Sequence, residues 1–304
     1  MSVSSETRIW FITGTSTGIG RALTESVLAA GEIVVAAVRK PAALEELQSR
    51  YPDPKLVVCQ ADVANADQIN RAFETIKERF GRLDVVVNNA GYSTCCEMEG
   101  IPDDAARQQL EINFWGPVNI CRQAVKFFRD VNPKGRGGRI VNVSSAGGYS
   151  TNPCFSFYCA SKFALEGFTQ ALNQEMVPEW NIKAVLIEPG GIETNIKDNL
   201  VFFPTPPAYK DPSTPSQAFV NWALKAPLLG LPDRVAKVIM RIVDEPEPPL
   251  RLPLGTDAWY AVTRMATQTL KDSEKWEDLI HSTNADEFDK GTVMKMFGVV
   301  DGGE

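Results

Sequence analysis

The sequence predicts an α/β fold with a doubly wound, seven-stranded and mostly parallel sheet that carries helices on both faces. Short β-branched runs recur along the chain, and longer helix-compatible segments such as residues 19–30 and 68–80 separate them. Those segments are long enough for the crossover helices that join parallel strands. A glycine-rich turn also follows the first run directly, as expected where a strand passes into a helix through a tight turn.

The expected strands are short apolar runs, most of them rich in Val and Ile. They cover residues 8–12, 33–38, 55–59, 83–87, 139–143, 182–187 and, more weakly, 250–254. At 304 residues the chain is long for an ordinary domain but fits one large α/β domain with an insertion and a tail. We therefore expect a single domain over residues 1–304, with its core at about 7–194 and 231–258.

Two segments interrupt or follow this core. Residues 195–230 combine several prolines with aromatic side chains, including Phe219 and Trp222, and are interpreted as an insertion with a short helix near residues 217–226. Residues 231–244 are then expected to be helical. Residues 259–304 are expected to form a C-terminal extension that packs on the outside or frays.

The composition excludes several classes of protein. A net charge of -7, from 31 basic and 38 acidic residues, argues against nucleic acid or an anionic membrane as the main partner. The six cysteines show neither a C-x-x-C spacing nor a dense disulfide pattern, so we expect reduced thiols, a cytoplasmic location and no metal site. No apolar run approaches the ~18 residues of a membrane span, and no leader segment is evident.

The glycine-rich turn TGTSTGIG at residues 13–20 has the spacing G-x-x-x-G-x-G and opens a helix-like segment. Glycines in such a turn let backbone N–H groups and the helix N-terminus approach a pyrophosphate. No Gly-Lys-Ser/Thr follows, so ATP is disfavoured. The alternative is a glycine turn without a ligand. The residues expected to bind a dinucleotide here are Gly14, Thr15, Ser16, Gly18, Ile19 and Gly20.

The end of the second expected strand, Ala37-Val38-Arg39-Lys40, distinguishes two dinucleotides. A site for the unphosphorylated cofactor usually has an acidic residue here, whereas Arg meets a 2′-phosphate. Arg39 and the absence of a carboxylate therefore predict NADP(H). The alternative is a solvated pair of surface cations.

The stretch YCASK places Tyr158 and Lys162 four residues apart, on one face of a helix. A neighbouring ammonium favours the phenolate, so we expect Lys162 to lower the pKa of Tyr158 towards the range of a useful general acid/base. Alone, the pattern more often means a surface Lys beside a packing Tyr.

Together with other motifs in order, these stretches resemble the short-chain dehydrogenase/reductase family. The resemblance runs from about residue 8 to 191 and implies a Rossmann fold, an NADP-dependent oxidoreductase and a homodimer or homotetramer. Residues 248–258 resemble, more weakly, the hydroxysteroid and retinol dehydrogenase branch. The further motifs are Asp62 in ADVAN, NNAG at 88–91, Asn113 in EINFWG, Ser145 in IVNVSSAGG, and Pro189-Gly190 with Thr194.

The resemblance assigns a role to each catalytic candidate. Tyr158 would donate and accept the proton, Lys162 would lower its pKa and hold the nicotinamide ribose, and Ser145 would orient the substrate oxygen. Ser144 is the competing serine, and spacing favours Ser145. Asn113 would bind a water in a proton relay, or would only stabilise a helix kink. Further cofactor contacts are implied for Asp62 at the adenine, Asn89, Gly91, Pro189, Gly190, and Ile192 with Thr194 at the carboxamide.

The insertion suggests the substrate. Its aromatic residues favour a largely apolar ketone, aldehyde or alcohol, although they would equally serve an oligomer contact. An imine substrate, an epimerisation, or NADPH sensing without turnover are the alternatives. A hydrolase is disfavoured because the single histidine, His281, lies in the tail and no G-x-S-x-G is present. Cys95, Cys96, Cys154 and Cys159 are interpreted first as apolar wall residues, with a redox role as the alternative.

Overall fold

The computed structural model describes residues 7–194 and 200–297. The chain divides into two compact units, Met1–Ala261 and Val262–Glu304. The sheet and every predicted site residue belong to the first unit.

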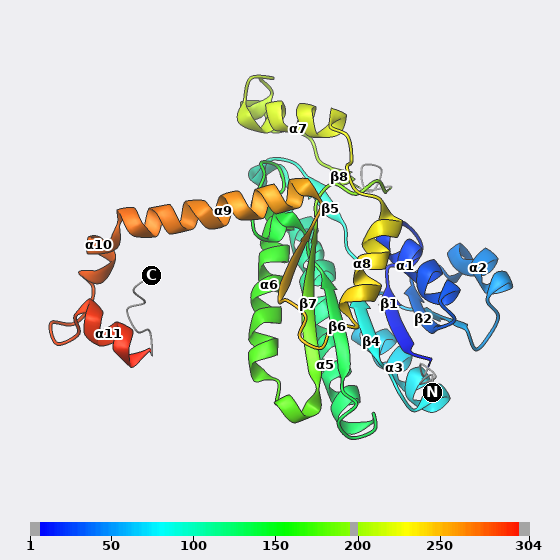
Figure 1. The fold of residues 1–304 in the computed structure, drawn as a ribbon. Coiled ribbons are helices and arrows are strands. Elements are labelled where there is room, and N and C mark those ends of the chain that lie inside the picture. Colours follow the sequence, from blue (N-terminus) through cyan, green and yellow to red (C-terminus); the bar gives the residue numbers. More distant parts are fainter. Residues whose placement is uncertain (1–6, 195–199, 298–304) are drawn as a thin grey trace. The chain divides into compact units, whose positions relative to one another are not determined.

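The first unit is built on a seven-stranded parallel sheet (Figure 1). From one edge to the other its strands are β3 (Leu56–Gln60), β2 (Ile33–Val38), β1 (Ile9–Thr13), β4 (Val85–Asn88), β6 (Gly138–Val143), β7 (Ile182–Pro189) and β9 (Arg251–Leu254). Every adjacent pair is parallel, for example Phe11 beside Val35 and Val86 beside Ile140. The seven predicted strands and the doubly wound topology are confirmed.

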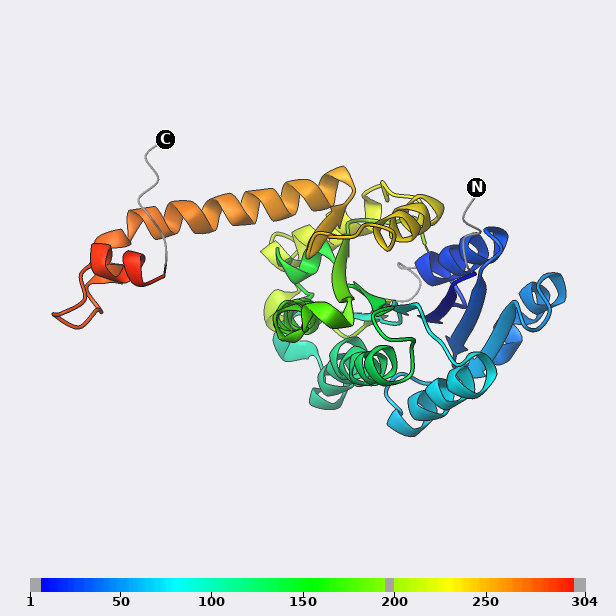
Figure 2. The same ribbon diagram turned by 60° about the horizontal axis from the view of Figure 1, so that its bottom comes forward.

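Helices cover both faces of the sheet, which is why its central strands are continuously apolar. All five residues of β1 are buried. One face packs against α1 (Gly18–Ala29), α2 (Glu45–Arg50) and α8 (Pro232–Ile242), through a core that includes Trp10, Leu23 and Ile239. The opposite face packs against α3 (Ala66–Phe80), α5 (Gly116–Asp130) and α6 (Ser156–Glu175) (Figure 2).

Shorter elements connect these layers. They include η1 (Pro41–Leu44), η2 (Met98–Gly100), α4 (Asp103–Leu110), the π-helical turn η3 (Glu111–Trp115), η4 (Ala146–Gly148) and η5 (Pro178–Trp180). Two of them matter for the site because η3 carries Asn113 and η4 follows Ser145 directly.

A second, two-stranded sheet was not predicted. It joins β5 (Ser93–Cys95) in parallel to β8 (Leu200–Phe202) in the insertion. Strands of three residues are too short to show an alternating pattern, so their pairing depends on tertiary contacts. The insertion also contains η6 (Pro207–Tyr209) and α7 (Pro215–Lys225), close to its predicted helix.

The buried carboxylate of Glu97 fixes the start of α7. It accepts hydrogen bonds from Ser216 Oγ at 2.7 Å and Gln217 Nε2 at 2.9 Å. These bonds tie the insertion to the loop that follows β5, so α7 has a defined position within the first unit.

The chain continues into α9 (Thr256–Lys275), α10 (Glu277–His281) and α11 (Lys290–Met296). In the second unit several large apolar side chains are exposed, among them Leu270, Leu279 and Phe297. Across residues 7–194 and 200–297, no helix combines the length and the apolar character that crossing a membrane requires.

Candidate active site

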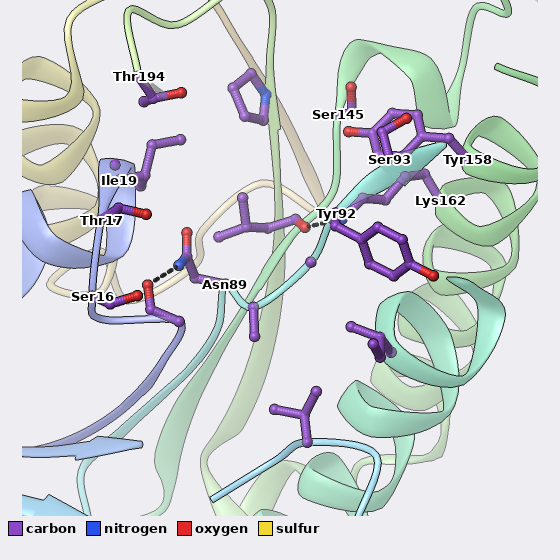
Figure 3. A pocket seen from close by; sticks show the side chains of 18 of the residues that line it. Ser16, Thr17, Ile19, Asn89, Tyr92, Ser93, Ser145, Tyr158, Lys162 and Thr194 are labelled. Carbon is purple, nitrogen blue, oxygen red and sulfur yellow. Dashed lines mark hydrogen bonds between the residues drawn. The ribbon is translucent and has the colours of Figure 1, made fainter. Parts of the chain in front are cut away.

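The site is a cavity of about 760 Å³. Its walls come from the segments after β1, β2, β3, β4, β6 and β7, so it lies at the carboxyl ends of the sheet, where open α/β sheets bind their ligands. Ser16, Thr17 and Ile19 of the glycine turn line one side, and Ser145, Tyr158 and Lys162 line the other (Figure 3). Asn89 lies between them.

The glycine turn is shaped for close approach. Gly14 has a φ of +68°, and a Cβ there would lie 2.8 Å from Asn89 Nδ2. A Cβ on Gly20 would lie 2.3 Å from the carbonyl oxygen of Gly14. Only glycine fits both positions. Helix α1 begins at Gly18, and among the described residues no side chain caps it and no acidic residue lies in its first turn. Its N-terminal N–H groups therefore suit an anionic ligand.

Asn89 holds this turn in place. Its Nδ2 donates to the carbonyl oxygens of Thr13 at 3.0 Å and Gly14 at 3.1 Å. Thr13 Oγ1 in turn accepts from the backbone N–H of Asn89 at 3.0 Å. The NNAG motif thus connects the end of β4 to the glycine turn, and the Asn89 side chain shapes the cavity wall as well as lining it.

Two predicted residues mark the end of the cavity beside β2 and β3. Arg39 is exposed and follows β2, and Asp62 follows β3 and is half-buried. Asp62 Oδ1 accepts from the backbone N–H of Ala64 at 3.0 Å. Both line the cavity, and Arg39 brings a cation to the place where a 2′-phosphate would need one.

Tyr158 and Lys162 lie on consecutive turns of α6. Lys162 is buried, its Nζ donates to the carbonyl oxygen of Val143 at 2.8 Å, and it lies 5.8 Å from the centroid of the Tyr158 ring. Burial lowers the pKa of the Lys162 ammonium to about 8. This lysine therefore holds a proton that it can lose near neutral pH.

The pKa of Tyr158 moves in the direction opposite to our prediction. Burial raises the pKa of the phenol, and the neighbouring Ser145 hydroxyl opposes that rise without reversing it. Lys162 does not produce the predicted lowering because its ammonium is directed to the Val143 carbonyl and is itself destabilised by burial. The phenol consequently stays protonated at neutral pH.

The structure also separates the two candidate serines. Ser144 Oγ donates to Glu166 Oε1 at 2.6 Å and is buried. Ser145 Oγ accepts from the backbone N–H of Gly147 at 3.0 Å, and a Cβ on Gly147 would lie 3.3 Å from both Ser145 Oγ and Tyr158 Cε1, so the Ser145 and Tyr158 side chains are neighbours. Only Ser145 is directed towards the phenol, which agrees with the preference from spacing.

Asn113 does not line the cavity but supports it from behind. Its Oδ1 accepts from the backbone N–H of Tyr92 at 3.1 Å, and its Nδ2 donates to Tyr92 O at 2.9 Å and to Ser161 Oγ at 3.1 Å. A Cβ on Gly91 would lie 3.1 Å from Asn113 Oδ1 and 3.8 Å from Lys162 Nζ. The amide and the ammonium thus approach each other across Gly91.

The segment after β7 forms another wall. Pro189, Gly190, Ile192 and Thr194 line the cavity, and a Cβ on Gly18 would lie 3.2 Å from Thr194 Cγ2. Ile192 pairs with Gly230 in an isolated parallel bridge. This bridge fixes the segment where it passes the glycine turn.

Two further residues predicted to bind the cofactor, Thr15 and Gly20, do not line the cavity. Thr15 is fully buried, with its Oγ1 3.5 Å from the carbonyl oxygen of Ala37. Sequence reasoning missed several residues that do line the cavity. Thr17, Val38, Ala61, Val63, Ala90, Ile112 and Val143 stand within motifs quoted above, and Tyr92 and Ser93 follow NNAG, whereas nothing local indicated Gln108, Leu200 or Val201. The missed residues are Thr17, Val38, Ala61, Val63, Ala90, Tyr92, Ser93, Gln108, Ile112, Val143, Leu200 and Val201.

The cysteines near the site are free and buried. Burial raises the pKa of Cys95 to about 11 and that of Cys154 to about 12. At neutral pH both are thiols, which are poor nucleophiles, and this favours their interpretation as small wall residues. Among the described residues, no group of three or more His, Cys, Asp or Glu side chains could hold a metal ion.

The sequence of this chain is similar to those of known oxidoreductases. The family described as short chain dehydrogenase matches residues 8–202. An uncharacterized oxidoreductase of Schizosaccharomyces pombe is 33% identical over 287 residues, which are 93% of this chain and 94% of that protein. The 11-beta-hydroxysteroid dehydrogenase A of Sesamum indicum is 36% identical over 193 residues, 62% of this chain and 53% of that protein. The resemblance to the family, with a hydroxysteroid dehydrogenase among the relatives, is confirmed.

Solved structures give the same result for the fold. A short-chain dehydrogenase from Streptomyces avermitilis has a TM-score of 0.83 and 32% identity, with 93% of this chain and all of that chain covered. A short chain dehydrogenase from Burkholderia cenocepacia, solved in complex with NADP, has a TM-score of 0.68 and 22% identity, with 89% and 97% covered.

Proposed function

Because this chain belongs to the short-chain dehydrogenase family, we propose that it is an NADP(H)-dependent oxidoreductase that interconverts a largely apolar ketone or aldehyde and its alcohol. The observation that carries the proposal is the convergence of Ser145, Tyr158 and Lys162 on one wall of the cavity, opposite the glycine turn. Ser145 and Tyr158 are neighbours on this wall, so the site offers two hydroxyls that can meet one substrate oxygen.

The residues present fit a bound NADP(H). Gly14 and Gly20 leave no room for side chains, the start of α1 offers N–H groups to a pyrophosphate, and Arg39 offers a charge to a 2′-phosphate. When bound, the nicotinamide supplies the hydride chemistry. The preference for NADP(H) over NAD(H) rests on Arg39.

The protein's part in the reaction is proton transfer and orientation. Negative charge develops on the carbonyl oxygen of the substrate during reduction, and Tyr158 donates its proton to that oxygen while Ser145 hydrogen-bonds it. The raised pKa keeps Tyr158 in the protonated form that a reductase needs. Lys162, with a pKa of about 8, is able to return a proton to Tyr158, and Asn113 beside it supports a relay towards solvent.

Aromatic contacts support an apolar substrate. The Tyr158 ring lies 6.3 Å from that of Phe155, which lies 6.1 Å from Phe219 of α7, and Phe219 lies 5.8 Å from Trp222. This series continues from the catalytic phenol to the insertion, and the outermost ring, Trp222, is 64% exposed. The series starts at the cavity wall with Tyr158, and the insertion adds Leu200 and Val201 to that wall, so an apolar group on the reacting carbonyl would meet apolar side chains there.

Two further expectations belong to this proposal. The six free cysteines support a reducing, cytoplasmic compartment. A homodimer or homotetramer through α6 is supported by Phe163, whose side chain is 45% exposed on that helix. Light scattering of the purified protein measures the oligomeric state directly.

The decisive test is consumption of NADPH and NADH against a panel of apolar ketones, aldehydes and imines, with Tyr158→Phe beside the wild type. We expect turnover with NADPH on a ketone or aldehyde, and a loss of roughly 10²–10⁴-fold in kcat in the variant, because the proton donor is removed. The variant should still bind NADPH, which fluorescence titration measures.

Other outcomes point to the alternatives. Turnover of an imine alone, or epimerisation without net NADPH consumption, would change the reaction. Tight NADPH binding without turnover of any panel member would favour a sensing protein. Full activity in Tyr158→Phe would exclude the proposed mechanism.

A further inference from the structure

Behind the segment that carries Ser145 lies a buried charged cluster that the proposed chemistry does not use. Glu166 of α6 and Glu188 of β7 are 1% and 0% exposed. Both face one cation, Arg251 of β9, which forms an ion pair with Glu166 Oε2 and lies 3.3 Å from Glu188 Oε1. Buried charges are costly unless they are paired. A cluster with two carboxylates for one guanidinium therefore needs a specific role to explain it.

Glu166 connects this cluster to the start of the catalytic segment. Ser144 Oγ donates to Glu166 Oε1 at 2.6 Å, and Ser144 is the residue directly before Ser145. A Cβ on Gly148 would lie 2.1 Å from the same Glu166 oxygen. The carboxylate thus occupies the space beneath residues 144–148, and Gly148 is the residue that leaves room for it.

Arg251 reaches the other end of the same segment. Its guanidinium carbon lies 5.4 Å from the centroid of the Tyr149 ring, within the range of a cation–π contact. One side chain therefore acts on residue 144 through Glu166 and on residue 149 directly. Ser145 lies between these two attachments, with its Oγ held by the N–H of Gly147 and next to the Tyr158 ring.

We propose that Arg251 is a positioning residue, which holds the 144–149 segment through Glu166 and Tyr149 and so keeps the Ser145 hydroxyl against Tyr158. The inference rests on the proposed function, because it gives Ser145 its part in orienting the substrate oxygen. Arg251 does not line the cavity. Its effect must therefore reach the reaction through the geometry of the segment.

The test compares Arg251→Met with a matched control, Lys183→Met. Lys183 lies on β7, the strand next to β9, and forms an exposed ion pair with Glu247. The control therefore removes a cation from a neighbouring strand without changing the cluster. We expect Arg251→Met to lower kcat about tenfold to a hundredfold, as small displacements of a reacting group do, with little change in KM for NADPH. Lys183→Met should behave as wild type, and Arg251→Lys should recover part of the lost kcat because it keeps the charge.

Two outcomes would overturn the proposal. One is a kcat for Arg251→Met that equals that of wild type. The other is an equal rise of the NADPH KM and fall of kcat in all three variants, which a general loss of structure would cause. If Arg251→Met does not fold, Tyr149→Leu beside Tyr149→Phe tests the second attachment, since only the leucine removes the ring and neither leaves a buried charge. Leucine should then lower kcat and phenylalanine should not.

Crystal structures of Arg251→Met and Lys183→Met separate this inference from the proposed function. If the wild type turns over no panel compound, the reductase proposal fails, but the structures still decide the positioning. Displacement of Ser145 Oγ from the N–H of Gly147 in Arg251→Met alone would support it. An unchanged Ser145 in that variant would overturn it.

Discussion

Helix α6 buries two charged side chains one turn apart, and the two have different kinds of partner. The ammonium of Lys162 faces a neutral group, the carbonyl oxygen of Val143, and burial lowers its pKa to about 8. The carboxylate of Glu166 instead pairs with Arg251 and accepts a hydrogen bond from Ser144. A buried charge that faces only a dipole holds its proton loosely, whereas an ion-paired charge is fixed. The first is suited to proton transfer and the second to holding a segment in place.

Replacement of Lys162 tests whether the loosely held proton of its ammonium takes part in the reaction, and it should have the largest effect. We expect Lys162→Met to lower kcat/KM by about 10²-fold or more, because the cation beside Tyr158 is lost. In the wild type, kcat/KM should fall as the pH rises above about 8, since the unprotonated amine no longer supplies that charge. A pH–rate profile of both proteins measures the two effects together.

Lys162→Arg provides the control for this profile. A guanidinium keeps its charge at any pH at which the protein is folded. The alkaline decline should therefore disappear in Lys162→Arg, even if its activity is low. A decline at the same pH in that variant would assign it to another group and remove Lys162 from the pH dependence.

This comparison also shows which parts of the molecule the sequence could reveal. Strands β1, β2 and β4 are continuous apolar runs, and the glycine turn, NNAG and YCASK are local patterns, so the fold and the catalytic wall could be predicted. The Glu166–Arg251 pair joins residues 85 positions apart, and no local pattern indicates it. The pKa of Tyr158 depends on burial, which the i, i+4 spacing does not contain, and that prediction was wrong in direction.

The ion-paired cluster of Glu166 and Arg251 also contains a second carboxylate, Glu188. Burial raises the pKa of its carboxyl to about 7. A carboxyl whose pKa rises on folding binds a proton in the folded state that the unfolded chain has lost. Its stabilising contribution is complete below the ordinary pKa of about 4.3 and is lost as the pH rises to about 7. Above that pH, ionised Glu188 shares Arg251 with Glu166, and the cluster carries a net negative charge.

Glu188→Gln should therefore stabilise the protein in a pH-dependent way. We expect the free energy of unfolding at pH 8 to rise by up to about 3 kcal/mol, with little change near pH 4.5, as the shift of the pKa sets the limit. Urea unfolding at the two pH values measures it. Glu247→Gln removes an 82% exposed carboxylate and should change stability little at either pH. A loss of stability in Glu188→Gln at pH 8 would mean that Arg251 needs both carboxylates.

Arg39 extends the comparison to a charge that is not buried at all, and its replacement should have the smallest effect. Its side chain is exposed at the end of β2, so solvent screens what it contributes. We expect Arg39→Ser to raise the KM for NADPH about tenfold, because one charge-assisted hydrogen bond to the 2′-phosphate is lost. The kcat and the KM for NADH should stay unchanged. Lys40→Ser is the matched control, since Lys40 is equally exposed but does not line the cavity. Equal KM changes in both variants would mean that the positive electrostatic potential of the two cations, and not a contact of Arg39, attracts the cofactor. Unchanged NADPH binding in Arg39→Ser would remove the basis for preferring NADP(H). A rise in the NADPH KM in Arg39→Ser alone would instead show that this exposed cation determines the preference for NADP(H).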